Sequence, residues 1–301
     1  MLSACRRTRT PSVHTCTLPP DDRDDHPRHR RGLYRAGSGE PLLLIHGFTD
    51  TWRTWRPVLA DLVQHFDVIA PTLHGHSDGP YLEEAADPRS FADMADMAEE
   101  MLEELGLDTF HVAGNSLGGG LALELARRGR ARSVIGLAPA GGLDHGNRAE
   151  ALRIVRQFQR MQTMTKRNLR ILPWVFRSPA RRRLALLDAM ERGHLMSAAD
   201  AVEMARRSIE CDIVRDDLFA VLRYGAPWLD GLEDIDCPVL IAWGEKDRIL
   251  PIDRHSERFK KEIPGVDFRV LPRIGHVPMH DDPKLIGSMI RDFALAAERA
   301  R

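Results

Sequence analysis

Residues 112–122 read Val-Ala-Gly-Asn-Ser-Leu-Gly-Gly-Gly-Leu-Ala, with Ser116 at their centre. Within them, Gly114 to Gly118 match the pattern Gly-x-Ser-x-Gly, in which a serine occupies a strained turn between a strand and a helix. A second match at residues 75–79, around Ser77, shows that three fixed positions in five recur by chance. The neighbouring sequence therefore has to decide between the two serines.

Only Ser116 lies between a predicted strand and a predicted helix. Residues 108–113, which precede it, include β-branched and aromatic side chains typical of a strand, and the leucines of residues 117–125 recur at helical spacing. The apolar run before Ser77 ends at Pro71, six residues too early for the same motif. We therefore interpret Ser116 as a nucleophile and Ser77 as a loop residue.

Asp247 is the candidate for the acid that would orient the base of such a nucleophile. It follows the fully apolar stretch 238–243, and an open α/β sheet presents its catalytic groups just beyond the carboxyl ends of buried strands. Asp144, shortly after the predicted strand 132–138, is the alternative acid. Aspartate is also common in ordinary turns after strands, so its position alone does not assign the role.

His276 is the candidate base. It follows a strand-like stretch at residues 267–271 and lies in a loop that Pro278 closes. The same proline separates His276 from His280 and argues against a helical histidine pair, so we expect no metal site. A single histidine is more often a surface residue, but the chain order of nucleophile, acid and base supports a catalytic role.

Acyl transfer also requires preorganised N–H donors for the oxyanion. The backbone N–H of Leu117, directly after the nucleophile, is one expected donor. The backbone N–H of Phe48 is the other, because the apolar stretch 42–45 leads directly to the turn at Gly47. His46 immediately precedes this turn and is interpreted as a packing and loop-bonding residue, not as a base.

Together these motifs resemble those of the α/β-hydrolase superfamily, in particular its lidded serine esterases and meta-cleavage-product hydrolases. The resemblance extends from residue 32 to about residue 295 and is carried by Leu44–Phe48, Ala70–Asp78, Gly114–Gly119, Gly244–Asp247 with Pro251, and Gly275–Pro278 with Pro283. It implies a doubly wound, mostly parallel sheet, an inserted all-helical cap, and hydrolysis through an acyl-enzyme without a cofactor. Because the nucleophile is a serine, the resemblance to haloalkane dehalogenases and epoxide hydrolases, which attack with a carboxylate, ends at the fold.

The chain divides into a tail, a core and an insertion. Residues 1–31 are polar and are expected to form a disordered tail. Residues 32–142 and 233–301 alternate strands with helices and are expected to form the α/β core, whereas residues 143–232 contain only helical patterns and are expected to form the cap. The family normally has two edge strands before the His-Gly turn, but only residues 32–36 could supply one here.

Predicted strands lie near residues 41–46, 66–70, 109–113, 132–138, 238–243 and 267–271; predicted helices lie near 52–64, 90–105, 117–129 and 283–298 in the core, and near 150–163, 179–191, 198–210 and 216–224 in the cap. The expected substrate-binding residues are Met161, Trp174 and Phe176 of the cap, together with Val277 beside the base. The cap carries sixteen basic and eleven acidic side chains. This excess could favour anionic substrates, although a solvated helical face explains it as simply.

Composition agrees with this class of protein. With 301 residues, 43% of them hydrophobic, the chain can bury a large core, and its net charge of −1 predicts no affinity for nucleic acid. No run of residues is long and apolar enough for a membrane span. The four cysteines lack metal-ligand spacing and are expected to be free thiols, which favours a cytoplasmic location. The 38 arginines against five lysines suggest a GC-rich bacterial genome.

The function predicted from these residues is hydrolysis of a small or medium apolar carboxylic ester by Ser116, Asp247 and His276. Cleavage of a carbon–carbon bond in a meta-cleavage product and cofactor-free perhydrolysis are alternative reactions for the same triad. A signalling regulator that binds a ligand under the cap without turning it over is the non-enzymatic alternative. The substrate itself and the oligomeric state, a homodimer included, stay open.

Overall fold

Seven strands form one sheet in the order β1-β3-β2-β4-β5-β6-β7 in a computed structural model, which describes residues 32–80, 91–143, 147–211 and 229–300. Only the β1–β3 pair is antiparallel, and the other neighbouring pairs are parallel. The strands are β1 (Leu33–Gly37), β2 (Pro41–Ile45), β3 (Asp67–Pro71), β4 (Phe110–Asn115), β5 (Ala131–Leu137), β6 (Val239–Gly244) and β7 (Asp267–Leu271). The mostly parallel sheet is confirmed, and within the described residues one edge strand, β1, precedes the strand β2 that leads to the His-Gly turn.

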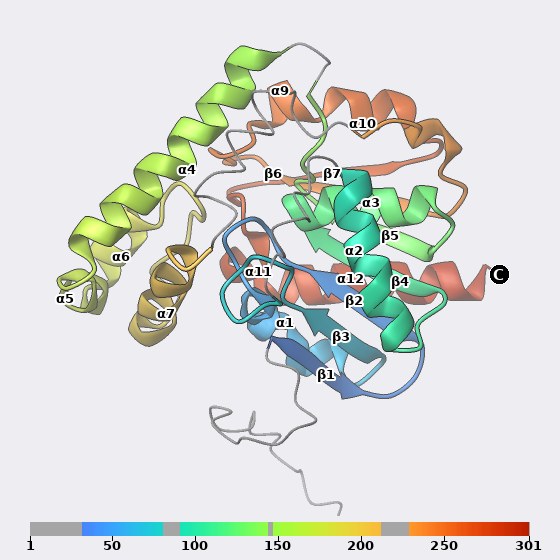
Figure 1. Ribbon diagram of the computed structural model, residues 1–301, viewed down its shortest axis with the longest axis horizontal. Helices are drawn as coiled ribbons and strands as arrows, with labels where there is room; N and C mark the ends of the chain where they lie inside the picture. Colours follow the sequence, from blue (N-terminus) through green and yellow to red (C-terminus); the bar gives the residue numbers. More distant parts are fainter. Residues whose placement is uncertain (1–31, 81–90, 144–146, 212–228, 301) are drawn as a thin grey trace, which may run out of the picture.

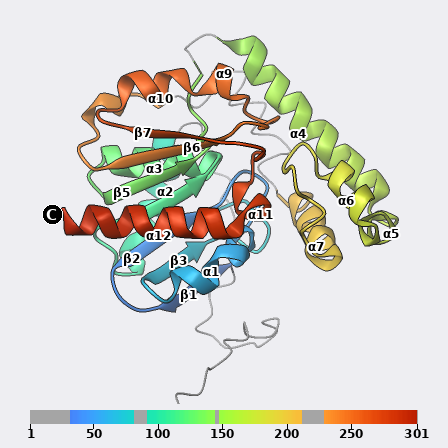
Figure 2. The same ribbon diagram turned by 180° about the vertical axis from the view of Figure 1, so that it is seen from behind.

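Helices cover both faces of this sheet, and a further group of helices stands to one side of it (Figure 1; Figure 2). In the core these are η1 (Trp52–Trp55), α1 (Arg56–Leu62), α2 (Phe91–Glu104), α3 (Leu117–Arg127), η2 (Leu232–Asp234), α9 (Ile252–His255), α10 (Glu257–Glu262), α11 (Pro278–Asp281) and α12 (Pro283–Arg299). The group at the side consists of α4 (Arg148–Asn168), α5 (Leu172–Arg177), α6 (Pro179–Ala185) and α7 (Ala198–Ser208), inserted between β5 and β6.

The central strands are apolar throughout because each is buried on both faces. Successive side chains of a strand point to opposite faces, so Leu43 packs in the core under α2, α3 and α10 while Leu44 packs in the core under α1 and α12. Phe91 of α2 and Phe259 of α10 belong to the first core, and Ile290 of α12 belongs to the second. Such two-sided burial is typical of parallel sheets. It holds the carboxyl ends of the strands in place, and these ends carry the residues of the candidate site described below.

The helical cap is confirmed, but its helices differ from those predicted. The predicted helix 179–191 is α6 alone, which ends at Ala185, and α5 was not predicted. A proline lies in the first turn of each, where its missing N–H costs nothing, and the Ser178 side chain accepts a bond from Arg181 N to cap α6. The predicted helix 216–224 lies outside the described residues.

The cap has a small apolar core of its own between α5, α6 and α7. It contains Phe176, Leu186, Met190, Met196, Ala201 and Ala205. The buried guanidinium of Arg182 holds the neighbouring turns together by donating to the carbonyl oxygens of Phe176, Gly193 and His194. These hydrogen bonds help to stabilise the cap, whose apolar core is much smaller than the two cores of the sheet.

Within the described ranges, no helix combines the length and the apolar character needed to cross a bilayer.

Candidate active site

Ser116 occupies the turn between β4 and α3 in a strained backbone conformation. Its φ is 54° and its ψ is −116°, a region that non-glycine residues rarely adopt. The turn is held to β5 because Ser116 N donates to Leu137 O at 2.9 Å. A Cβ on Gly114 would lie 2.1 Å from Gly118 O, and a Cβ on Gly118 would lie 2.2 Å from Ile45 O. Both glycines are therefore required for strand, turn and helix to approach so closely.

His276 and Asp247 form a buried hydrogen-bonded pair. His276 Nδ1 donates to Asp247 Oδ2 at 2.7 Å, which leaves Nε2 with a free lone pair. The other oxygen of Asp247 accepts from the backbone N–H groups of Ile249 and Leu250, at 2.9 and 2.8 Å. The carboxylate is thus fixed by the turn after β6, and it fixes the histidine ring in turn.

Asn115, the residue before Ser116, ties the serine turn to the histidine loop. Its side-chain amide donates to His276 O at 2.9 Å and to Leu137 O at 3.0 Å. The sequence pattern leaves this position open, so its positioning role was not predicted. The amide connects the carboxyl ends of β4 and β5 to the loop that follows β7.

Asp281 is a second positioning residue that sequence analysis missed. It is fully buried, and its carboxylate accepts from Gly275 N at 2.7 Å in the histidine loop. The same carboxylate accepts from Glu191 N at 3.1 Å and from Arg192 N at 2.6 Å in the cap. Burial raises the pKa of Asp281, while these backbone donors oppose that shift. Only its short distance from His276 in the sequence could have drawn attention to it.

The turn after β2 lies directly beside Ser116. A Cβ on Gly47 would come within 3.3 Å of the Ser116 Cβ, and Phe48 follows at the edge of the same site. His46 donates from Nδ1 to Gly47 O at 2.7 Å and accepts from Leu73 N at Nε2, at 2.9 Å. Burial holds the pKa of His46 well below its usual value, so the ring stays neutral and fixes the turn.

A cavity of about 930 Å³ opens onto Ser116 and His276. Its walls combine the Gly47–Phe48 turn with apolar side chains of the cap, namely Phe158, Met161, Met164, Ile171, Leu172, Val175, Phe176, Leu186 and Met204. Of the four expected substrate-binding residues, Met161 and Phe176 contribute to the described wall. Trp174 is 60% exposed, with its ring 3.8 Å from the Arg181 guanidinium carbon, and Val277 packs in the core under α1 and α12.

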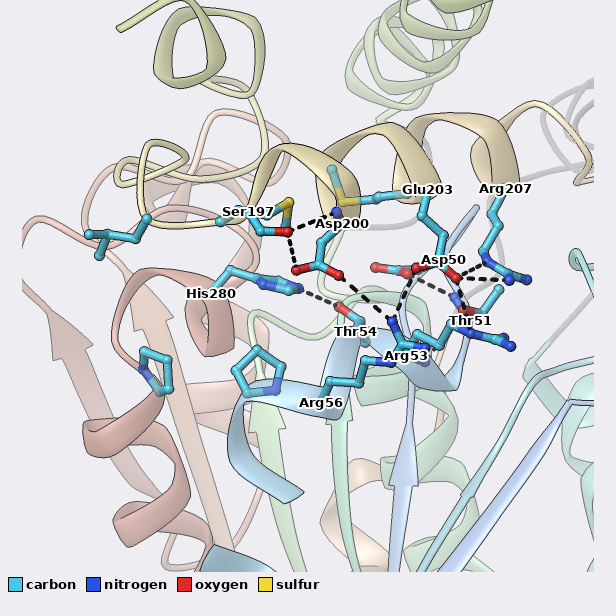
Figure 3. Close-up of a pocket in the computed structure, with 15 residues that line it drawn as sticks. Asp50, Thr51, Arg53, Thr54, Arg56, Ser197, Asp200, Glu203, Arg207 and His280 are labelled. Carbon is cyan, nitrogen blue, oxygen red and sulfur yellow. Dashed lines mark hydrogen bonds and ion pairs between the residues drawn. The ribbon is translucent and has the colours of Figure 1, made fainter. Parts of the chain in front are cut away.

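A second cavity of about 350 Å³ lies where α7 packs on η1 and α1 (Figure 3). It shares Asp50 and Met204 with the larger cavity. Burial raises the pKa of Asp50 to about 6 and lowers that of His280 to about 4. In this wall His280 Nε2 lies 3.4 Å from Thr54 Oγ1, a geometry that suits a neutral ring.

Charged residues around this second cavity join the cap to the core. Glu203 of α7 pairs with Arg53 at 3.2 Å and with Arg56 at 3.1 Å. Arg207, one turn further along α7, pairs with Glu203 and with Asp78 of the loop after β3. In that loop, Ser77 donates to Glu210 Oε2 at 2.5 Å, a contact that fits its interpretation as a loop residue. We call the five charged residues Arg53, Arg56, Asp78, Glu203 and Arg207 the α7 clamp.

Within the described residues, no group of three or more histidine, cysteine or acidic side chains is placed to hold a metal ion. The alternative acid Asp144 lies outside the described residues.

Residues 42–286 match the model of the alpha/beta hydrolase family, and the chain belongs to that family. It is thus a hydrolase of the α/β fold. It is 34% identical to epoxide hydrolase EphH of Mycobacterium tuberculosis over 205 residues, which cover 68% of this chain and 94% of that protein. It is 26% identical to 2-hydroxymuconate semialdehyde hydrolase of Pseudomonas sp. over 298 residues, which cover 90% of this chain and 92% of that protein.

Solved structures show the same fold. The naproxen esterase of Bacillus subtilis superposes with a TM-score of 0.66 at 19% identity, over 88% of each chain.

Proposed function

We propose that this protein is a serine esterase that cleaves small or medium apolar carboxylic esters through an acyl-enzyme. The observation that supports this most strongly is that Ser116 and the histidine held by Asp247 line one cavity. Ser116 and His276 face that cavity, and His276 Nδ1 is held by the Asp247 carboxylate at 2.7 Å. A serine and a histidine that line the same largely apolar cavity are suited to attack on an ester carbonyl.

In the proposed reaction, His276 Nε2 takes the proton of the Ser116 hydroxyl as its oxygen attacks the carbonyl carbon. The Leu117 and Phe48 N–H groups stabilise the tetrahedral oxyanion. His276 then gives the proton to the leaving alcohol and afterwards removes one from the water that hydrolyses the acyl-enzyme. Throughout, Asp247 remains ionised and stabilises the charged imidazole.

The similarity to an epoxide hydrolase does not alter this proposal. Relatives of that type are expected to attack with a carboxylate, whereas this chain has Ser116 at the nucleophile position. Transfer of an acyl group from a substrate alcohol to the serine oxygen gives an ester that water can cleave, so the residue present favours acyl chemistry.

Cleavage of a carbon–carbon bond in a carboxylate-bearing dienoate is the second candidate. The observation that favours it is the charge of the cavity wall, which contains Arg153, Arg156 and Arg160 of α4 beside only two acids, Asp50 and Asp188. Of these arginines, Arg153 is paired with Glu150. The similarity to 2-hydroxymuconate semialdehyde hydrolase over most of both chains points the same way.

A substrate screen separates the two reactions. Purified protein is assayed with para-nitrophenyl esters of graded acyl length and, in parallel, with a ring-fission dienoate, and the Ser116→Ala protein provides the blank. The esterase proposal predicts turnover of the esters that exceeds that of the dienoate in kcat/KM. If the protein cleaves the dienoate efficiently and turns over every ester poorly, the esterase proposal is wrong and the second candidate takes its place.

A further inference from the structure

The positive charge of the chain is concentrated in one part of the cap. Residues 147–187, which hold α4, α5 and α6, contain eleven basic side chains and a single acidic one, Glu150. Because the whole chain has a net charge of −1, the remaining residues carry a net charge of −11. An asymmetry of this size indicates a surface that attracts an anionic partner.

The same part of the cap exposes large apolar side chains. Of the eight that are exposed among the described residues, six belong to the cap. Four of them lie between the C-terminal end of α4 and the end of α6: Met164 at 59%, Ile171 at 51%, Trp174 at 60% and Leu184 at 73% exposure. We call the exposed apolar and basic residues of segment 164–184 the cap tip. In both views, α5 and α6 lie together at the C-terminal end of α4, away from the sheet (Figure 1; Figure 2).

Packing of the cap core determines which residues this tip exposes. Phe176 is buried against α7, and Arg182 is buried within hydrogen bonds to backbone carbonyls. The other residues of these short helices, Trp174 and Leu184 among them, are consequently left outside. They cannot turn inward without breaking that core, so their exposure is built into the fold.

Most basic side chains of the cap tip are not neutralised by acids of the described chain; Arg183, which pairs with Glu191 at 3.8 Å, is an exception. Lys166, Arg167, Arg170 and Arg177 are exposed and form no ion pair within residues 32–80, 91–143, 147–211 and 229–300. The arginines of the α7 clamp, by contrast, are each paired with one or more carboxylates. These four cations of the cap tip thus remain available for an external anionic partner.

A combination of unpaired cations with exposed tryptophan, leucine, isoleucine and methionine matches the surface of an anionic lipid bilayer. The cations are attracted to the headgroups, and the apolar side chains enter the boundary between headgroups and acyl chains. Nucleic acid would use the cations but would gain little from Leu184 or Ile171. A second copy of the chain that docked through the same surface would bring two strongly basic surfaces together. Residues 1–31 carry seven basic and four acidic side chains, so they are not complementary either.

We propose that the cap tip docks on anionic lipid surfaces. Met164 and Ile171 belong both to the cap tip and to the wall of the catalytic cavity. Docking therefore places the mouth of that cavity against the lipid, where apolar esters partition. This last step rests on the proposed esterase function, whereas the docking itself does not.

The test measures vesicle binding by sedimentation with the full-length Ser116→Ala protein, so that lipid hydrolysis does not interfere. Vesicles contain phosphatidylcholine alone, or phosphatidylglycerol and phosphatidylcholine in equal parts. We expect binding to the anionic vesicles at low ionic strength, weak binding to phosphatidylcholine, and loss of binding at high salt.

Two pairs of variants identify the surface, and thermal unfolding checks that each is folded. The first variant removes three charges of the cap tip and should weaken partitioning onto the anionic vesicles on the order of 100-fold; it combines Lys166→Gln, Arg167→Gln and Arg170→Gln. Its control removes equal charge from α10 and α12 and should change this partitioning little; it combines Lys261→Gln, Lys284→Gln and Arg299→Gln. Trp174→Ser with Leu184→Ser should weaken partitioning by about tenfold. The matched control, Val270→Ser with Leu285→Ser, changes two exposed apolar residues of the core.

Absence of binding to the anionic vesicles at low salt overturns the proposal. The proposal is also overturned if the cap-tip variants and their controls lose vesicle binding to the same extent. If transfer RNA displaces the protein from the vesicles and the apolar variant binds them normally, the cap tip is a polyanion site and not a lipid-docking surface. Because the binding assay requires no turnover, failure of the esterase proposal would leave this result unaffected.

Discussion

The sheet core and the cap meet at one cavity but are held together by different interactions. Around Ser116, strands and helices approach until their backbones touch, and glycines such as Gly118 make that approach possible. The cap has a small apolar core and is joined to the rest of the molecule by the α7 clamp and by the bonds to Asp281. Backbone packing tolerates little displacement, whereas ion pairs near solvent contribute modestly and respond to salt. The reacting groups are therefore expected to be rigid and the substrate wall adaptable.

The largest effect should come from Ser116, the proposed nucleophile. Ser116→Ala should reduce the hydrolysis of para-nitrophenyl butyrate by about 10⁴-fold or more, because the acyl-enzyme cannot form, while the unfolding temperature should change little. Ser77→Ala is the matched control, since it alters the other Gly-x-Ser-x-Gly copy, and should retain most of the activity. Comparable activity losses in both variants would invalidate the assignment of Ser116.

Next in size is the acid that orients His276. Asp247→Asn should lower kcat by about 10³- to 10⁴-fold, because the imidazole loses its preferred tautomer and its compensating charge. Asp144→Asn should leave kcat nearly unchanged. Steady-state kinetics on the same ester measures both, and the reverse order of effects would transfer the role to Asp144.

The tight packing of the core can be broken at a single glycine. In Gly118→Ala the new methyl group would lie 2.2 Å from Ile45 O and 2.5 Å from His46 O, so the free energy of unfolding should fall by about 3 kcal/mol or more. In Gly287→Ala, on α12, the closest neighbour is 3.4 Å away, and stability should be equal or up to about 1 kcal/mol higher. Urea unfolding compares the two, and similar values would show that the serine turn can relax.

The stability of the protein should fall in acid because of His280, which lies where the cap meets the sheet core. Burial lowers the pKa of this ring from 6.5 to about 4, so the unfolded chain binds the proton first as the pH falls. The contribution of the neutral ring, about 3 kcal/mol, is present above pH 6.5 and is lost between pH 6.5 and about pH 4. His280→Asn should flatten the stability curve in that range, and the exposed His65→Asn should not. Parallel curves for His280→Asn and the unaltered protein would contradict this prediction.

The smallest effect should come from the α7 clamp. Glu203→Gln removes the carboxylate shared by Arg53, Arg56 and Arg207, which should raise KM severalfold with little change in kcat and make KM less sensitive to salt. Glu257→Gln, which breaks an exposed pair with Lys260 on α10, should leave KM unchanged. If kcat fell as much as KM rose, the clamp would position the reacting groups as well as the cap.

The strands and the turn around Ser116 could be predicted because local sequence determines them. A buried parallel strand must be apolar, as Leu42–Ile45 and Val239–Trp243 are, and the serine turn requires small residues at fixed places. The structure brings Asp247 and His276 together from turns that follow neighbouring strands, β6 and β7. Their proximity could be inferred from chain order because the sheet topology is simple.

The cap could not be predicted to the same depth. Its apolar residues follow helical spacing, but spacing does not show which side faces the cavity; thus Phe176 is buried while Trp174 is exposed. The split between α5 and α6 depends on the proline and serine at residues 178–179, within what looked like a single apolar region. The roles of Asn115 and Asp281 depend on contacts across the fold, and no local pattern indicates them.

Asp281 has a practical consequence for engineering. Cap exchange between relatives is an obvious way to alter selectivity, and the natural joints are the points where the chain leaves β5 and enters β6. The Asp281 carboxylate nevertheless joins cap residues Glu191 and Arg192 to the loop of His276. A grafted cap without two backbone N–H groups at that place would leave the buried Asp281 carboxylate partly unsatisfied, close to the loop that carries His276, the proposed base. Donor caps are therefore better chosen by the geometry of this turn than by the pocket they bring.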